Sequence, residues 1–112
     1  MVADCLFCKI AAGEIPATVV YDNDQVLAFE DLNPQAPTHV LLIPKKHLAD
    51  IGELGGDPDT AAAVVAGIAA VAAQLGLESY RTVFNTGPGA GQTVFHVHAH
   101  VLGGRKLTWP PG

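Results

Sequence analysis

The spacing of apolar and polar positions along the 112-residue chain predicts several strands and one long helix. Residues 38–44 form an almost unbroken apolar run, which is typical of a central strand. Residues 18–21 and 26–30 flank an Asp-Asn-Asp turn and predict a hairpin. Residues 80–85 alternate and predict a further strand. With the histidine-rich strand described below, this order predicts an α+β fold with an antiparallel five-stranded sheet and one main helix.

The main helix is predicted between Asp57 and Gly76. Asp57 suits the N-cap, Pro58 the first helical position and Gly76 the end. An apolar stripe repeats at helical spacing and comprises Ala61, Val64, Val65, Ile68, Val71, Ala72 and Leu75. The other side carries no charge and comprises Ala62, Ala63, Ala66, Gly67, Ala69, Ala70 and Ala73. This side predicts a second packed surface, such as a subunit interface; the alternative is an exposed face made of strong helix formers.

Residues 96–102 contain three of the five histidines, alternating with small or apolar residues. The alternation predicts a half-buried strand with His96, His98 and His100 on one face. Neighbours on that face lie about 6.6 Å apart, close enough to serve one ligand or one metal. Packing gives no reason to align three groups that titrate near neutral pH, so a merely polar strand face is the weaker interpretation. Either the imidazoles bind a catalytic metal, or one attacks phosphorus while its neighbours hold phosphate oxygens.

Composition narrows the function classes. The length and the 49% hydrophobic content indicate a single globular domain over residues 1–112. No apolar run is long enough for a membrane span and no signal pattern opens the chain, so we expect a soluble, cytoplasmic protein without a membrane partner. The net charge of −5 argues against a nucleic-acid partner, although it permits one small phosphate ligand.

Two cysteines, Cys5 and Cys8, open the chain just before a short helical turn predicted at residues 9–12. Thiols at this spacing supply half of a zinc site. His39, His47 and the triad offer further ligands. The alternative is a reduced, inert pair of cysteines.

Three further features of the sequence are candidates for ligand binding: a glycine-rich loop, Thr93 and Asp31. The loop of residues 86–93 contains three glycines in five residues, and such turns let backbone amides approach an anion. Thr93, three residues before His96, could add a hydroxyl donor. Asp31 follows a predicted strand; its spacing favours a solvated turn, and a carboxylate for a ribose diol is the alternative.

Taken together, these motifs resemble the histidine triad family, and within it the Hint branch. The resemblance covers nearly the whole chain. It is carried by five segments: Ala36-Pro37-Thr38-His39, Ile43-Pro44-Lys45-Lys46-His47, Gly91-Gln92-Thr93-Val94, His96-Val97-His98-Ala99-His100-Val101-Leu102 and Trp109-Pro110-Pro111-Gly112. It implies a two-fold homodimer with a continuous sheet. It also implies hydrolysis of purine nucleoside 5′-phosphoramidates, such as AMP phosphoramidate, AMP-lysine and aminoacyl adenylates, without a catalytic cofactor.

The resemblance also implies residue roles. His98 would be the nucleophile that forms a nucleotidyl-histidine, with His100 and His39 as further catalytic residues. The nucleotide would be bound by Phe7, Phe29, Asp31, Leu32, Asn85, Gly91, Gln92, Thr93, His98, His100 and Trp109. Within this set, Asp31 would bind the ribose, which reverses the turn interpretation. The family often has Ser in place of Thr93, so the hydroxyl is retained with an added methyl.

The cysteines resemble those of bacterial triad proteins and related uridylyltransferases. That likeness implies a structural Zn²⁺ held by Cys5, Cys8, His47 and His96. Two other functions remain open at this point. One is a dinucleoside polyphosphate hydrolase or nucleotidyl transferase of the same superfamily. The other is a non-catalytic, zinc-stapled module that binds a nucleotide or a partner.

Overall fold

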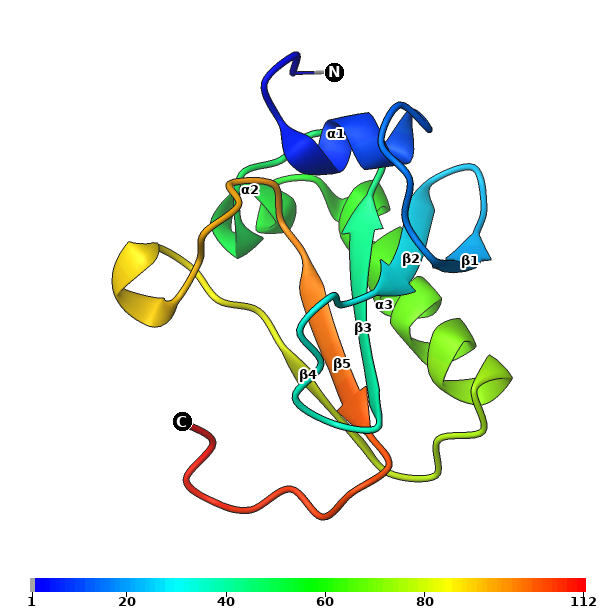
Figure 1. Cartoon of the computed structure of the whole chain (residues 1–112). Coiled ribbons are helices and arrows are strands. Elements are labelled where there is room, and N and C mark those ends of the chain that lie inside the picture. The colour runs from blue at the N-terminus through cyan, green and yellow to red at the C-terminus, as the bar shows by residue number, and fades with distance from the viewer. Residues whose placement is uncertain (1) are drawn as a thin grey trace.

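The computed structural model describes residues 2–112 and contains one five-stranded antiparallel sheet in the order β1-β2-β3-β5-β4 (Figure 1). The strands are β1 (Val19–Asp22), β2 (Val26–Glu30), β3 (Thr38–Pro44), β4 (Tyr80–Val83) and β5 (Ala99–Gly103). The α+β class and the five-stranded sheet are therefore confirmed, and the apolar run forms the central strand.

One long helix packs on this sheet, and three shorter helical segments join it. They are α1 (Leu6–Ala11), α2 (Ile51–Gly55), α3 (Pro58–Gln74) and the 3₁₀ turn η1 (Pro88–Ala90). The predicted ends of α3 are confirmed: the Asp57 carboxylate accepts from the Thr60 amide, and Gly76 follows the helix at φ 69°. Within residues 2–112, no helix is long and apolar enough to cross a membrane.

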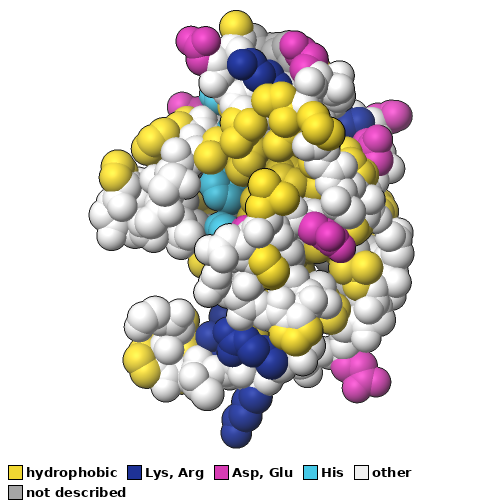
Figure 2. All heavy atoms as spheres, in the orientation of Figure 1, with side chains coloured by type: hydrophobic (Ala, Val, Ile, Leu, Met, Phe, Trp, Pro, Cys, Tyr) yellow, Lys and Arg dark blue, Asp and Glu magenta, His cyan; other side chains and the backbone are white. Residues whose placement is uncertain are grey.

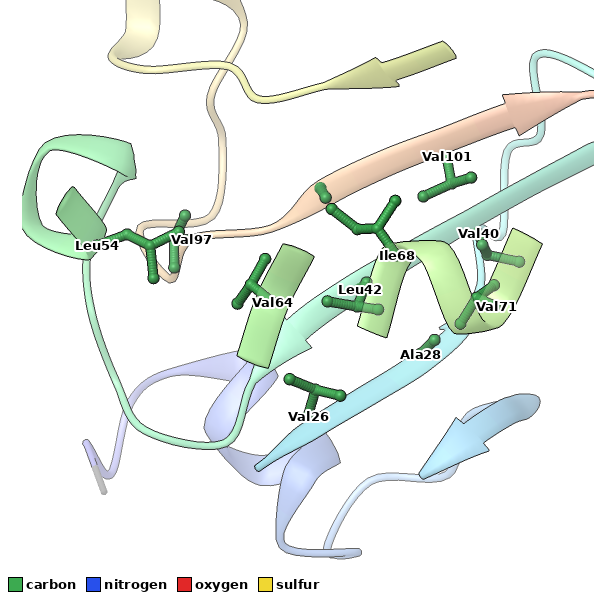
Figure 3. Packing of buried hydrophobic residues seen from close by; sticks show 11 residues of the cluster. Val26, Ala28, Val40, Leu42, Leu54, Val64, Ile68, Val71, Val97 and Val101 are labelled. Carbon is green, nitrogen blue, oxygen red and sulfur yellow. The ribbon is translucent and has the colours of Figure 1, made fainter. Parts of the chain in front are cut away.

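The main core lies between α3 and one face of the sheet (Figures 1 and 3). The residues that α3 buries are Thr60, Val64, Gly67, Ile68, Val71 and Ala72. The predicted apolar stripe was wrong at Val65, which is 65% exposed, and at Leu75, which is also exposed. Gly67, which was predicted on the opposite side, is buried. Gly67 faces the sheet, and a Cβ built at this position would lie 3.0 Å from side-chain atoms of both Leu42 and Val26. The helix therefore approaches the sheet closely at this glycine.

The two short helices lie outside the predicted pattern. The first begins at Leu6 rather than Lys9, because the Cys5 thiol caps it by accepting from the Cys8 amide. α2 was not predicted at all. Its signal was present as Asp50 and Glu53: the Asp50 carboxylate accepts from the Glu53 amide, and the Glu53 carboxylate accepts from the Ala49 amide.

The histidine-rich strand is shorter than predicted, because β5 begins at Ala99 rather than His96. Ala99 pairs with Leu42, so continued pairing would set Val97 opposite Pro44, which has no amide proton to give. The Val97 amide instead donates to the carbonyl of Leu48, at 2.7 Å. Side chains still alternate: Val97 packs in the α3 core, while His98 lies against Phe7 on the opposite face.

Candidate functional site

Four ligand atoms meet at the start of α1. The donor atoms of Cys5, Cys8, His47 and His96 all lie within 4.8 Å of one another. The Nδ1 atom of His96 is 3.4 Å from the Cys5 sulfur and 3.2 Å from the Nδ1 atom of His47. Ligands around tetrahedral zinc are separated by about 3.3–3.8 Å, given typical zinc–sulfur and zinc–nitrogen bonds. These donors therefore form a site that fits a structural zinc ion.

The surroundings of His96 support this assignment. Its Nε2–H donates to the carbonyl of Pro44 at 2.7 Å, which leaves the Nδ1 lone pair free for a metal. Burial, assisted by His47 and His98, lowers the pKa of His96 and keeps the ring neutral. Burial also raises the pKa of the Cys5 thiol, and a dication bound there favours the thiolate. Zinc at this position ties α1 to the segment that precedes β5.

The central histidine of the triad has one ring nitrogen bound to the backbone. The Nδ1 atom of His98 lies 2.8 Å from the carbonyl oxygen of His96. A carbonyl can only accept, so Nδ1 carries the proton and Nε2 has an unprotonated lone pair. The edge of the Phe7 ring, 5.0 Å away between centroids, packs against the His98 ring. The structure thus holds His98 in the tautomer that a nucleophile needs.

His39 and His100 are protonated on the other ring nitrogen, Nε2, in contrast to His98. The Gln35 amide donates to Nδ1 of His39, so His39 carries its proton on Nε2. That atom is 2.9 Å from Nδ1 of His100 and donates to it. His100 consequently carries its own proton on Nε2 and presents a donor. Burial, and then the neighbouring His98 and His39, lowers the pKa of His100 to about 4, so the ring is neutral at pH 7.

Asp31 completes this group and also serves the turn predicted from its spacing. Its Oδ1 atom accepts from the Asn33 amide, while Oδ2 lies 3.4 Å from Nε2 of His39. Asp31, His39 and His100 are close enough to be considered as metal ligands. However, a metal-bound imidazole donates its second nitrogen's proton to an acceptor, whereas the second nitrogen of His39 faces an amide donor. The group therefore suits a hydrogen-bonded chain better than a metal.

An apolar cleft of about 230 Å³ lies beside these histidines, between α1 and the sheet. It contains three residues that the resemblance implies for the nucleotide, Phe7, Phe29 and Leu32, together with Asp31. Leu6, Ile10 and Leu41 also line it, and the sequence interpretation missed them. The alternation of β3 gave a signal for Leu41, which pairs directly with His100.

The glycine loop is built differently from the prediction. The Gly91 amide already donates to the carbonyl of Pro88. The Gln92 side chain is buried, accepts from the Gly87 amide, and donates to the carbonyls of Ala49 and Val94. Gln92 thus braces the loop and has no free donor to offer a nucleotide.

Three residues implied for the nucleotide remain to be placed: Asn85, Thr93 and Trp109. The side-chain nitrogen of Asn85 lies 3.9 Å from where a Cβ on Gly91 would be, so these two are neighbours. Thr93 is exposed, in a groove it shares with Cys5 and Leu6. Trp109 is 81% exposed in the tail of this single chain.

Comparison with known proteins decides the family. Residues 12–107 match the HIT domain. The chain belongs to the HIT family. A HIT family hydrolase from Legionella pneumophila is 53% identical, with a TM-score of 0.93 over 97% of this chain and 100% of that one.

Two other relatives are named for zinc binding and for nucleotide binding. A 14 kDa zinc-binding protein from Zea mays is 46% identical over 96% of this chain and 87% of its own length. A histidine triad nucleotide-binding protein from Candida albicans is 30% identical, with a TM-score of 0.82 over 96% of this chain and 83% of that one. The family and the hydrolase-like fold of this HIT protein are thereby established, and the resemblance to the histidine triad family is confirmed.

Proposed function

We propose that this HIT protein hydrolyses the P–N bond of purine nucleoside 5′-phosphoramidates through a nucleotidyl-histidine intermediate. One observation carries the proposal: His98 offers a bare Nε2 lone pair, and its neighbour His100 offers an Nε2–H. A nucleophile and a donor of this kind, placed on adjacent same-face positions, are what displacement at phosphorus requires. Their ring centroids are 5.1 Å apart.

The reaction proceeds as two displacements. Nε2 of His98 attacks phosphorus, the P–N bond to the leaving group breaks, and the leaving nitrogen takes a proton from solvent and departs as an amine. The Nδ1–H bond to the His96 carbonyl stabilises the positive charge that develops on the His98 ring. Water then attacks phosphorus, the bond to His98 breaks, and the nucleoside monophosphate is released. The water that attacks in this second displacement returns one proton to solvent, so the two steps balance.

The surrounding residues bind the nucleotide in this proposal. The base lies in the apolar cleft with Phe7, Phe29 and Leu32. Asp31 accepts from the ribose hydroxyls through the carboxylate oxygen that the turn does not use. The phosphate is held by His100 with Asn85, Thr93 and the backbone near Gly91, and donors aimed at its oxygens stabilise the transition state.

The decisive experiment is a product assay on AMP phosphoramidate and on diadenosine tetraphosphate, with a rapid acid quench of labelled substrate. The proposal predicts AMP from the phosphoramidate and a transient, acid-labile adenylate on His98. Preferential cleavage of the tetraphosphate would indicate the polyphosphate hydrolase or transferase instead. Binding of AMP without turnover of either substrate would indicate a non-catalytic nucleotide-binding module.

We further propose that two copies form a two-fold homodimer. The outer side of α3 is uncharged and exposes Ala62, Val65, Ala66, Ala69 and Ala73. Within the described chain, the edge strand β4 pairs only with β5. Its other edge is therefore free to pair with a strand of a second copy. Both surfaces suit a symmetric partner. In such a dimer, the exposed Trp109 tail can reach the partner's site.

A further inference from the structure

The active face of the sheet arranges its side chains in two rows that run across four strands. Directly paired residues project to the same side of a sheet. One row therefore reads Phe29, Leu41, His100 and Val83 from β2 to β4. In the next row, His39 and Arg81 both pair with Leu102. Arg81 thus shares the face that carries His39 and His100.

The order of the strands indicates how the proposed substrate is oriented across the sheet. The apolar cleft lies over β2 and β3, and His100 lies on β5. The strand beyond His100 is β4, which carries Arg81 one row away. Rows on one face are about 6.6 Å apart and strands about 4.8 Å apart, a separation that an arginine side chain can span. His98 lies on the other side of His100, just before β5 and two rows from Arg81. A leaving group that departs from phosphorus on the side opposite His98 and extends past His100 therefore points toward Arg81.

Positive charge is concentrated at this end of the face. Arg81, Arg105 and Lys106 are three of the six Lys and Arg residues, and they line a cavity of about 400 Å³ with Ser79, Tyr80 and Leu107. Figure 2 shows Lys and Arg side chains at the lower margin of the hollow whose wall displays histidines.

These three cations also lack acidic partners. Across residues 2–112, no carboxylate lies within 4.0 Å of the Arg81, Arg105 or Lys106 nitrogens, whereas Lys45 and Lys46 pair with Asp22 and Asp57. The Arg105 guanidinium is held in place by two carbonyls, those of Gln35 and Lys106. An uncompensated basic cluster on a chain of net charge −5 is a local site for an anion.

We propose that Arg81, with Arg105 and Lys106, binds a negatively charged group on the leaving-group side of the substrate, either a carboxylate or a phosphate. This inference rests on the proposed function for its orientation. It makes Arg81 a specificity-determining residue, which favours phosphoramidates of amino acids over those of neutral amines. Since Arg105 and Lys106 are exposed and Arg81 is only half-buried in the single chain, the expected discrimination is roughly three- to tenfold.

The test compares AMP-alanine, which has a free carboxylate, with AMP-alaninamide, which is neutral and of similar size. The ratio of their kcat/KM values should fall roughly three- to tenfold in Arg81→Gln and be restored in Arg81→Lys. Lys106→Gln provides a second variant should Arg81→Gln fold poorly. Lys45→Gln removes one positive charge elsewhere and should leave the ratio at its wild-type value.

A binding measurement separates this inference from the proposed function. The α,β-methylene analogue of ADP places a second anionic group beyond the α-phosphate and cannot be cleaved at that bridge. Its affinity relative to AMP should fall in Arg81→Gln by the same factor, even if no phosphoramidate is hydrolysed. Absence of hydrolysis would refute the proposed function alone. An unchanged kcat/KM ratio, or an unchanged affinity ratio, in both Arg81→Gln and Lys106→Gln would overturn the anion site.

Discussion

At the scale of single residues, backbone groups determine which ring nitrogen is protonated in His39, His96 and His98. A carbonyl faces one nitrogen of His96 and one of His98, and an amide faces one nitrogen of His39. Peptide groups have fixed donor and acceptor roles, so the fold itself sets these tautomers. The chemistry proposed for His98 therefore depends on a backbone carbonyl, that of His96, rather than on a neighbouring side chain.

Replacing His98 with Asn should separate binding from chemistry. Asn retains some hydrogen bonding but cannot form the hydrolysable phosphorus–nitrogen bond, so AMP affinity should persist while turnover falls by several orders of magnitude. Calorimetry with AMP and single-turnover kinetics measure the two effects. His100→Ala should be milder, with a loss of roughly 10²–10³ for one phosphate donor. Near-normal turnover in His98→Asn would instead indicate direct attack by water.

The low pKa of His100 predicts how stability depends on pH. In the folded protein this pKa is about 4, below the ordinary value of 6.5, so the unfolded chain binds more protons between these values. The free energy of unfolding should therefore decrease as the pH falls from about 6.5 toward 4. Urea denaturation across this window, with imidazole NMR titration of His100, provides the measurement. A titration midpoint near 6.5 for His100 would contradict the prediction.

At the scale of elements, α1 depends on the metal site. A six-residue helix is not stable by itself, and Cys5 and Cys8 connect this one to His47 and His96. The short helix also supplies Phe7 to both the second hydrophobic cluster and the His98 ring. Structural zinc thus maintains one wall of the apolar cleft.

Cys8→Ser should lower zinc content well below about one ion per chain and destabilise the fold. Structural zinc contributes its binding energy to folding, so the loss should be on the order of several kcal/mol. Elemental analysis and thermal denaturation measure both changes. His39→Gln, which alters a buried histidine outside the donor set, should retain zinc. If chelation abolished activity before any loss of stability, the zinc would be catalytic rather than structural.

The contact between α3 and the sheet provides a second prediction at this scale. Gly67→Val places methyl groups where even a Cβ meets Leu42 and Val26 at 3.0 Å. Overpacking of this kind should lower the free energy of unfolding by about 1–3 kcal/mol. Gly55→Val, in α2, adds a side chain where a Cβ meets nothing within 4 Å and should change it by less than about 1 kcal/mol. Denaturant unfolding of both variants tests this, and equal effects would argue against the close approach.

At the scale of the whole molecule, the two faces of the sheet have separate tasks. The face under α3 is an aliphatic core, while the opposite face carries the histidines, the cleft and the basic cluster (Figures 2 and 3). The uncharged outer side of α3 is left for the proposed second copy.

The dimer proposal predicts that Val65→Lys shifts the protein toward monomers. This side chain is 65% exposed in the single chain, and a buried, unpaired ammonium would oppose association. Sedimentation at micromolar concentration should show a dimer for the wild type and a lighter species for the variant. A monomeric wild type would refute the interface on α3.

Deletion of residues 107–112 should preserve the fold and alter leaving-group preference.

Much of this architecture could be predicted because its signals are local. Asp57, Pro58 and Gly76 mark the ends of α3, and the apolar run of residues 38–44 predicts the central strand. The sequence predictions were wrong where a contact with a residue distant in the chain determined the local structure. Pro44 shortens β5 because it removes a hydrogen bond from the neighbouring strand, and Gly67 is buried because two side chains of the sheet approach it.

By itself, the sequence determined the elements, the fold class, the candidate residues and the family resemblance, since periodicity, capping and motif spacing are properties of short segments. Only the tertiary structure separated His96, which lies in the zinc site, from His98, the proposed nucleophile. That separation depends on which groups face each ring nitrogen, and the carbonyl at His96 Nε2 comes from Pro44, 52 positions earlier. The same folding gives the three triad histidines different environments: His96 meets the thiols, His98 a carbonyl and His100 another imidazole.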